Sequence, residues 1–85
     1  MQTRVATISI IVENTESVSD LNELLHEYGE YIIGRMGIPY KKCDISIISV
    51  AVDAPLDIIN GLSGKIGKLS GVNAKTAYSS IICEN

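Results

Sequence analysis

The sequence has little histidine and cysteine, the residues that most often hold transition metals. It contains one histidine, His26, and two cysteines, Cys43 and Cys83, with no Cys-x-x-Cys spacing. A zinc or nickel site needs several such ligands in one place, so we predict no metal site within one chain. The cysteines are expected to be free thiols in a reducing cytoplasm. A site shared between subunits, combining His26, Cys43 and a carboxylate, stays open.

The sequence also lacks the residue arrangements of common enzymes. Nothing places a nucleophile beside the single imidazole, so neither a Ser-His-Asp nor a Cys-His arrangement can be argued. No glycine-rich phosphate loop opens a helix, because the segment 13–16 before the first predicted helix is acidic and repels phosphate. His26 falls in the last turn of that helix, where the helix dipole favours a cation. We therefore predict no catalytic residues and a protein that is not an enzyme.

Positive charge is scarce. There are 7 Lys and Arg residues against 10 Asp and Glu residues, which gives a formal net charge of −3. Nucleic-acid binding draws much of its affinity from phosphate neutralisation, so we expect no direct binding to nucleic acid. The first residues do not read as a signal peptide, and the longest uncharged run, Ile45 to Val52, is too short to cross a membrane. These features predict a cytoplasmic protein without membrane contact.

What the sequence has is apolar periodicity, with 46% hydrophobic and 20% charged residues. Period-two alternation predicts strands over 5–12, 31–36, 44–53 and 72–78, and helical spacing predicts helices over 18–28 and about 55–69. The 85 residues are expected to form a single domain. The order of elements predicts an α+β, ferredoxin-like βαββαβ fold, with a four-stranded antiparallel sheet and both helices on one face.

Local signals predict how the elements begin and end. Ser17 with Asp20 fits a capping box, and Gly29 can take the left-handed conformation that ends a helix. Gly and Pro so close together predict a loop over 37–42. Residues 79–85 are a tail that either frays or pairs at a sheet edge.

Two features predict self-association. Arg35 and Lys75 are the only charges in the middle of a strand, so the second face of the sheet carries almost no charge, unlike a sheet face that water covers. Gly61, Gly64 and Gly67 interrupt the second helix, either for close packing on the sheet or for close approach of a partner subunit. We predict a homo-oligomer, a dimer or a tetramer.

The segment 27–40 is the candidate functional site, because it holds three of the four tyrosines and three of the seven glycines. Arg35 is costly in an apolar strand unless it is paired. Its partner is either an internal carboxylate (Glu30, Asp44 or Asp53) or, functionally, an anionic ligand or a neighbouring subunit. The predicted ligand-binding residues are Tyr31, Arg35, Gly37, Ile38, Pro39 and Tyr40.

Several runs of the sequence resemble a known family. They are residues 25–40, 47–50, 52–55, 62–67, 71–72 and 75–78. Together they resemble the iron-only hydrogenase system regulators, from Val5 to about Tyr78, and the run from His26 to Tyr40 is the most specific. The resemblance implies an ACT-like fold related to the C-terminal domain of nickel-responsive repressors. It also implies dimers or tetramers, and a genetic link to the maturation of iron-only hydrogenases.

The nickel-responsive repressors differ from this chain in two respects. Their metal is held by several histidines and a cysteine across subunits, a pattern that this chain matches poorly. They also carry a separate DNA-binding domain that these 85 residues are not expected to contain, so we expect any effect on transcription to require a partner.

Two functional hypotheses follow. The first is a non-enzymatic regulatory module, a homo-oligomer that senses a small molecule at a subunit interface lined by residues 31–40. The alternative is a structural or adaptor protein that docks a hydrogenase-maturation enzyme or a DNA-binding partner through its sheet face or edge, with no ligand. The sequence does not identify a cofactor.

Overall fold

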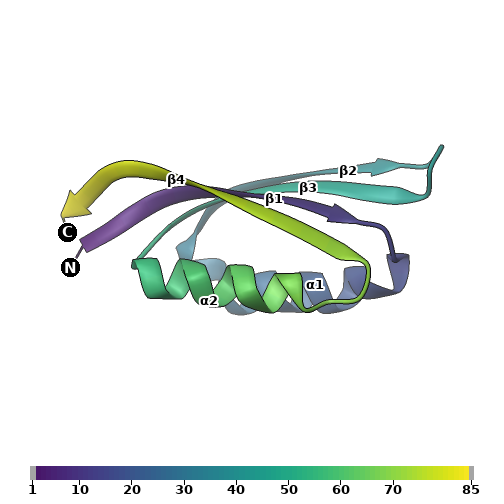
Figure 1. Cartoon of the computed structure of the whole chain (residues 1–85), viewed down its shortest axis with the longest axis horizontal. Coiled ribbons are helices and arrows are strands. Elements are labelled where there is room, and N and C mark those ends of the chain that lie inside the picture. The colour runs from purple at the N-terminus through teal and green to yellow at the C-terminus, as the bar shows by residue number, and fades with distance from the viewer. Residues whose placement is uncertain (1, 85) are drawn as a thin grey trace.

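The structure, a computed structural model, describes residues 2–84 and contains a four-stranded antiparallel sheet with two α-helices on one face (Figure 1). The elements in chain order are β1 (Gln2–Val12), the 3-10 helix η1 (Thr15–Ser17), α1 (Val18–Glu27), the 3-10 helix η2 (Gly29–Tyr31), β2 (Ile32–Tyr40), β3 (Ile45–Ala54), α2 (Leu56–Gly67) and β4 (Val72–Glu84). The sheet order is β2-β3-β1-β4, so β2 and β4 are the edge strands. The predicted ferredoxin-like fold is confirmed.

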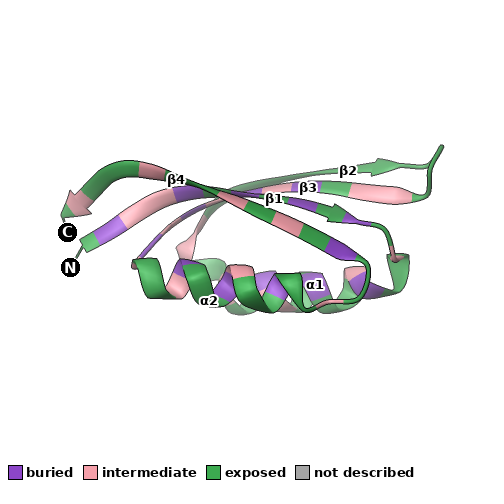
Figure 2. Ribbon diagram, viewed as in Figure 1, coloured by how far each residue is buried: buried purple, intermediate pink, exposed green. Residues whose placement is uncertain are grey.

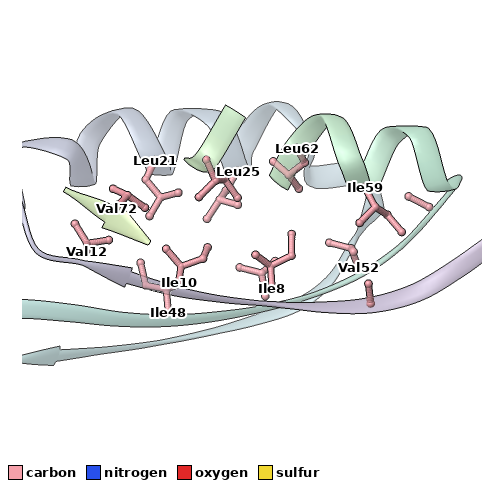
Figure 3. Packing of buried hydrophobic residues seen from close by; sticks show 14 residues of the cluster. Ile8, Ile10, Val12, Leu21, Leu25, Ile48, Val52, Ile59, Leu62 and Val72 are labelled. Carbon is pink, nitrogen blue, oxygen red and sulfur yellow. The ribbon is translucent and has the colours of Figure 1, made fainter. Parts of the chain in front are cut away.

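The hydrophobic core lies between the sheet and the two helices (Figure 3). Alternate residues of the central strands β1 and β3 point toward the helices, and both helices turn an apolar stripe toward them. The buried residues are Ala6, Ile8, Ile10, Val12, Leu21, Leu25, Ile48, Val50, Val52, Ala54, Ile59, Leu62, Ile66 and Val72. Since burying one large aliphatic side chain stabilises the fold by about 1.5–3 kcal/mol, this cluster is its main source of stability.

The loop predicted over residues 37–42 is wrong, because β2 continues to Tyr40 and only residues 41–44 form the turn. Gly37 pairs with Ile48 and Pro39 with Ser46 in the ladder between β2 and β3. An edge strand bonds on one side only, so a proline without an N–H is tolerated there. Residues 33–40 are exposed, as Figure 2 shows for β2.

The C-terminal tail pairs with β1 as far as it is described. β4 runs to Glu84, which lies opposite Gln2, and the Gln2 Nε2 amide donates a hydrogen bond to Glu84 Oε1 at 3.1 Å. The register shifts between Arg4 and Ala6, so this last stretch of pairing follows a bulge. Of the two alternatives for this tail, pairing at an edge is the observed one for residues 79–84, and Asn85 lies outside the described residues.

The predicted capping box at the start of α1 is wrong. The Ser17 side chain makes no capping bond; its hydroxyl donates to the Ser70 carbonyl at 2.6 Å, in the turn before β4. Asn14 caps the preceding η1 instead, with its side-chain oxygen accepting from the Glu16 N–H at 3.1 Å. A tertiary hydrogen bond thus replaces the local one.

The left-handed glycine is Gly71 rather than Gly29. Gly71 has a φ of 66°, and a Cβ there would lie 2.5 Å from the Cβ of Asn14. Its carbonyl accepts a hydrogen bond from the Glu13 N–H at 2.7 Å, and Asn73 Nδ2 donates to Glu13 Oε1 at 3.0 Å. These contacts fix the end of β1 against the start of β4. The chain passes directly from α1 into η2 at Gly29 without a left-handed residue.

Candidate functional site

A shallow groove of about 210 Å³ lies between α1 and the edge strand β2. Its lining residues are Val18, Asn22, Arg35, Gly37, Ile38, Pro39, Ser46 and Ile48. The ladder explains the hollow: Arg35, Gly37 and Pro39 lie opposite Val50, Ile48 and Ser46, which face the helices. Because Gly37 has no side chain, the strand is uncovered between Arg35 and Pro39.

Arg35 supplies the charge of this groove. Its Nη2 donates a hydrogen bond to Asn22 Oδ1 at 3.0 Å, and the side chain is exposed. Among residues 2–84, no carboxylate forms an ion pair with Arg35, so the prediction of an internal partner at Glu30, Asp44 or Asp53 is wrong. A guanidinium carries five N–H donors, so most of them remain available to an anion.

The structure groups four of the six predicted ligand-binding residues in this groove: Arg35, Gly37, Ile38 and Pro39. Tyr40 lines a neighbouring depression near the hairpin turn, with Lys41 and Asp44. Tyr31 is in η2, where it packs against the core and lies 6.4 Å from the Tyr28 ring, centroid to centroid. The two tyrosines among the predicted ligand-binding residues, Tyr31 and Tyr40, therefore do not line one pocket within a single chain.

Sequence reasoning missed the wall that α1 contributes. Val18 and Asn22 are four residues apart and share one face of the helix. That spacing is visible in the sequence, but it does not say which strand this face meets. Asn22 is the residue that orients Arg35, so it belongs to the candidate site.

The sheet face away from the helices carries an uncovered apolar row. Ile38, Ile47 and Ile11 are cross-strand neighbours on β2, β3 and β1, and their exposed fractions are 47%, 41% and 42%. Met36 and Tyr40 flank this row on β2, with 59% and 42% exposed. We call these five residues the open-face patch. Five adjacent large side chains are more than the scattered apolar residues of an ordinary surface.

A second groove lies between the two helices and is acidic. It is lined by Asp20, Glu23 and Glu27 of α1 and by Lys65 of α2, together with two leucines. Lys65 Nζ lies 5.1 Å from the centroid of the Tyr28 ring. Its interaction with the Tyr28 side chain, and to a smaller extent the charge of Glu27, raise the pKa of Lys65. This arrangement is typical of a solvated helix face.

No group of three or more His, Cys, Asp and Glu side chains in the range 2–84 is arranged to hold a metal ion. His26 is in the last turn of α1, whereas Cys43 is exposed in the turn 41–44 between β2 and β3. A site shared between subunits stays an untested alternative. No helix within residues 2–84 has the length and hydropathy needed to span a membrane.

Comparison with solved structures first places the fold. A formyltetrahydrofolate deformylase from Pseudomonas putida KT2440 superposes with a TM-score of 0.62 at 14% identity, over 86% of this chain and 28% of the enzyme. At that identity the likeness concerns the fold alone. A comparison with curated proteins finds no match.

A nearer relative is the structure of uncharacterized protein TM1266 from Thermotoga maritima. It superposes with a TM-score of 0.86 at 35% identity, over 89% of this chain and 96% of that one. The family model named TM1266-like, whose provisional description is iron-only hydrogenase system regulator, matches residues 4–76. The chain therefore belongs to the TM1266-like family of iron-only hydrogenase system regulators.

Proposed function

We propose that this protein is a non-enzymatic regulatory module of the iron-only hydrogenase system, which acts in the cytoplasm as a homo-oligomer and senses a small anionic molecule. The binding site is the groove between α1 and β2, with Arg35 as the anion-binding residue and Gly37, Ile38 and Pro39 as its wall. Tyr31 and Tyr40 border this segment of the interface.

The observation that carries the proposal is Arg35 itself. Its side chain is exposed in a groove, and its hydrogen-bond partner is the neutral amide of Asn22. An arginine held by a neutral acceptor keeps its full charge, and the guanidinium fork matches a carboxylate or a phosphate in two parallel hydrogen bonds. Val18, Ile48 and Pro39 add apolar walls. The best-fitting ligand is thus a small anion with a short apolar part.

The size of the groove favours a site that a second chain completes. Its volume of about 210 Å³ is smaller than the roughly 300–1,000 Å³ of usual small-molecule pockets. The groove opens along the edge strand β2, which is exposed over residues 33–40. A neighbouring copy on this edge would close the groove and couple ligand binding to assembly. Any effect on transcription would then pass through a separate DNA-binding partner.

The first test is native mass spectrometry of the protein purified gently from its own host. We expect an even-numbered oligomer that carries the extra mass of a small anion. Arg35→Ala should lose this mass, while Lys75→Ala, which removes the other mid-strand cation, should retain it. An oligomer that carries no extra mass in any preparation would contradict the sensing role.

The open-face patch favours a second candidate, an adaptor without a ligand. Its exposed side chains at Ile11, Ile38 and Ile47 offer an apolar surface to a maturation enzyme or a DNA-binding protein. In that case Ile47→Lys would abolish binding of the protein partner, and Arg35→Ala would leave it unchanged. Pull-down with both variants separates the two candidates.

A further inference from the structure

Two glycines of the edge strand β2 have no explanation within the described chain. Neither Gly34 nor Gly37 has a positive φ. A Cβ at Gly34 would meet nothing within 4 Å, and one at Gly37 would meet only Ile48 Cγ1, at 4.0 Å. Glycine weakens a strand, and in strands it often marks a site where another backbone or a ligand approaches closely. The edge on which they lie is open to such an approach.

The position of Pro39 shows which backbone groups face that open edge. In an antiparallel pair, alternate residues direct both the N–H and the C=O away from the neighbouring strand. Pro39, which has no N–H, lies opposite Ser46 and fits only at an outward position. Gly37 and Arg35, two and four residues earlier, are outward too. Their backbone groups are free to bond another strand.

We infer that β2 pairs in antiparallel fashion with β2 of a second copy of this chain, with Met36 of the two copies opposite each other on the two-fold axis. In this register Arg35 lies opposite Gly37 of the second copy, and Ile38 lies opposite Gly34. Both of these large side chains thus face a glycine. Arg35 and Gly37 exchange backbone hydrogen bonds on both sides of the axis.

The neighbouring symmetric registers fit less well. A shift in one direction places Arg35 opposite Arg35 of the second copy, and like charges directly opposite are destabilising. A shift in the other direction brings both Pro39 residues next to the axis, opposite Arg35, where each lacks the N–H that the pair requires. In the register centred on Met36 they lie instead at the ends of the pairing, opposite Ile33, where β2 is already irregular. The sequence of β2 therefore favours the register centred on Met36.

This pairing rests on the proposed function and adds the arrangement of its two sites. It brings the two Arg35 grooves together on the helix side of one continuous sheet. Diagonal neighbours across an antiparallel pair are about 7–8 Å apart, which is the relation between the two Arg35 residues. Gly37 of each copy leaves the space beside them open. The inference requires the oligomer of the proposed function but not its ligand.

The test is a cysteine variant on the predicted axis, Met36→Cys, in a Cys43→Ser, Cys83→Ser background. Met36 is 59% exposed, so the substitution is tolerated by the fold. A residue opposite itself at a non-hydrogen-bonded position has a Cα separation of about 4.5 Å, which a disulfide can span. We expect mild oxidation to give a covalent dimer on a non-reducing gel.

Arg35→Cys and Gly37→Cys in the same background are the matched controls, because each lies on the axis in one of the other registers. We expect them to cross-link at least tenfold more slowly than Met36→Cys. Faster cross-linking by either control, or a Met36→Cys protein that stays reduced, would overturn the inference. Neither outcome depends on a ligand, so the anion-sensing role would remain to be judged on its own test.

A second variant tests the interface without a cross-link. Gly37→Pro removes an outward N–H that the pairing with β3 does not use but that bonds to Arg35 of the second copy. We expect Gly37→Pro to be a folded protein that no longer pairs through β2, by circular dichroism and native mass spectrometry. Gly37→Ala is the matched control: it keeps the N–H, and its Cβ meets only Ile48 Cγ1 at 4.0 Å, so it should keep the oligomer of the wild type. A Gly37→Pro protein that assembles like the wild type, or a wild type that is monomeric, would refute the pairing.

Discussion

Arg35 had two alternative partners at the level of the sequence. A guanidinium in an apolar strand was expected either to neutralise an internal carboxylate or to meet an anionic ligand or a neighbouring subunit. It instead lies in an exposed groove and bonds to Asn22. A charged side chain that bonds to an exposed partner typically contributes no more than about 1 kcal/mol to the stability of a fold. We therefore expect folding not to require the charge of Arg35.

We expect Arg35→Ala to change the free energy of unfolding by less than about 1 kcal/mol. Urea denaturation of Arg35→Ala and Asn22→Ala, followed by circular dichroism, measures this change. If the two variants lose more than about 3 kcal/mol each, then Arg35 is a structural residue and its role in binding loses its support.

Gly71, unlike Arg35, is expected to be needed for the stability of the fold, because its backbone conformation and its close neighbours both require glycine. Gly71→Ala forces an L side chain to a φ of 66° and places a Cβ 2.5 Å from Asn14 Cβ. We expect a loss of at least about 2 kcal/mol in the free energy of unfolding. The measurement is the thermal unfolding of Gly71→Ala compared with that of Gly29→Ala. Gly29→Ala is the control, because a Cβ at Gly29 meets nothing within 4 Å. Equal melting temperatures for both variants would contradict this expectation.

At the scale of elements, apolar periodicity was a reliable guide where an element is buried on a defined face. Both helices and the central strands β1 and β3 were predicted with small errors at their ends, because their buried side chains recur at the spacing of their secondary structure. β2 was predicted too short. Gly37 and Pro39 oppose regular structure locally, but pairing with β3 outweighs them at an edge.

The candidate site was only half predictable for a related reason. The grouping of Arg35, Gly37, Ile38 and Pro39 follows from adjacency in one strand, which a sequence shows directly. The contribution of Val18 and Asn22 depends on how α1 lies over the sheet. Packing of this kind involves residues far apart in the chain, so no local pattern reports it.

The glycines of α2 allow a prediction for that element. A Cβ added at Gly64 or Gly67 would meet nothing within 4 Å, so close packing inside one chain does not require these glycines. We expect Gly64→Ala to raise the free energy of unfolding by about 0.5–1 kcal/mol, because alanine restricts the unfolded helix segment more than glycine does. Thermal unfolding measures the gain.

The same variant reports on where subunits meet. If β2 forms the interface, then Gly64→Ala leaves the subunit number unchanged in native mass spectrometry. Dissociation of the Gly64→Ala oligomer would instead place α2 at a subunit contact and explain its glycines.

The whole molecule is elongated, with principal extents of 43 × 18 × 17 Å. The sheet extends beyond the helix layer at both ends: the β2–β3 hairpin projects at one end, and the paired ends of β1 and β4 project at the other (Figure 1). Pairing through β2 would double the sheet while leaving its open face uncovered. The open-face patches of the two copies would then form one surface around the two-fold axis, since Met36 and Ile38 lie on β2 itself.

An apolar surface of that extent is rarely left in water, so we expect two such dimers to stack through their open faces into a tetramer. Ile47 is at the centre of the patch and is 41% exposed, so Ile47→Lys adds a charge there without disturbing the core. We expect the wild type to be a tetramer and Ile47→Lys to be a dimer in native mass spectrometry. The Met36→Cys cross-link should form equally well in both backgrounds, because it reports on the edge and not on the face. If the wild type is already a dimer and Ile47→Lys does not change it, then the open face is not a subunit contact. The patch would then be left for a different protein, as the adaptor role requires.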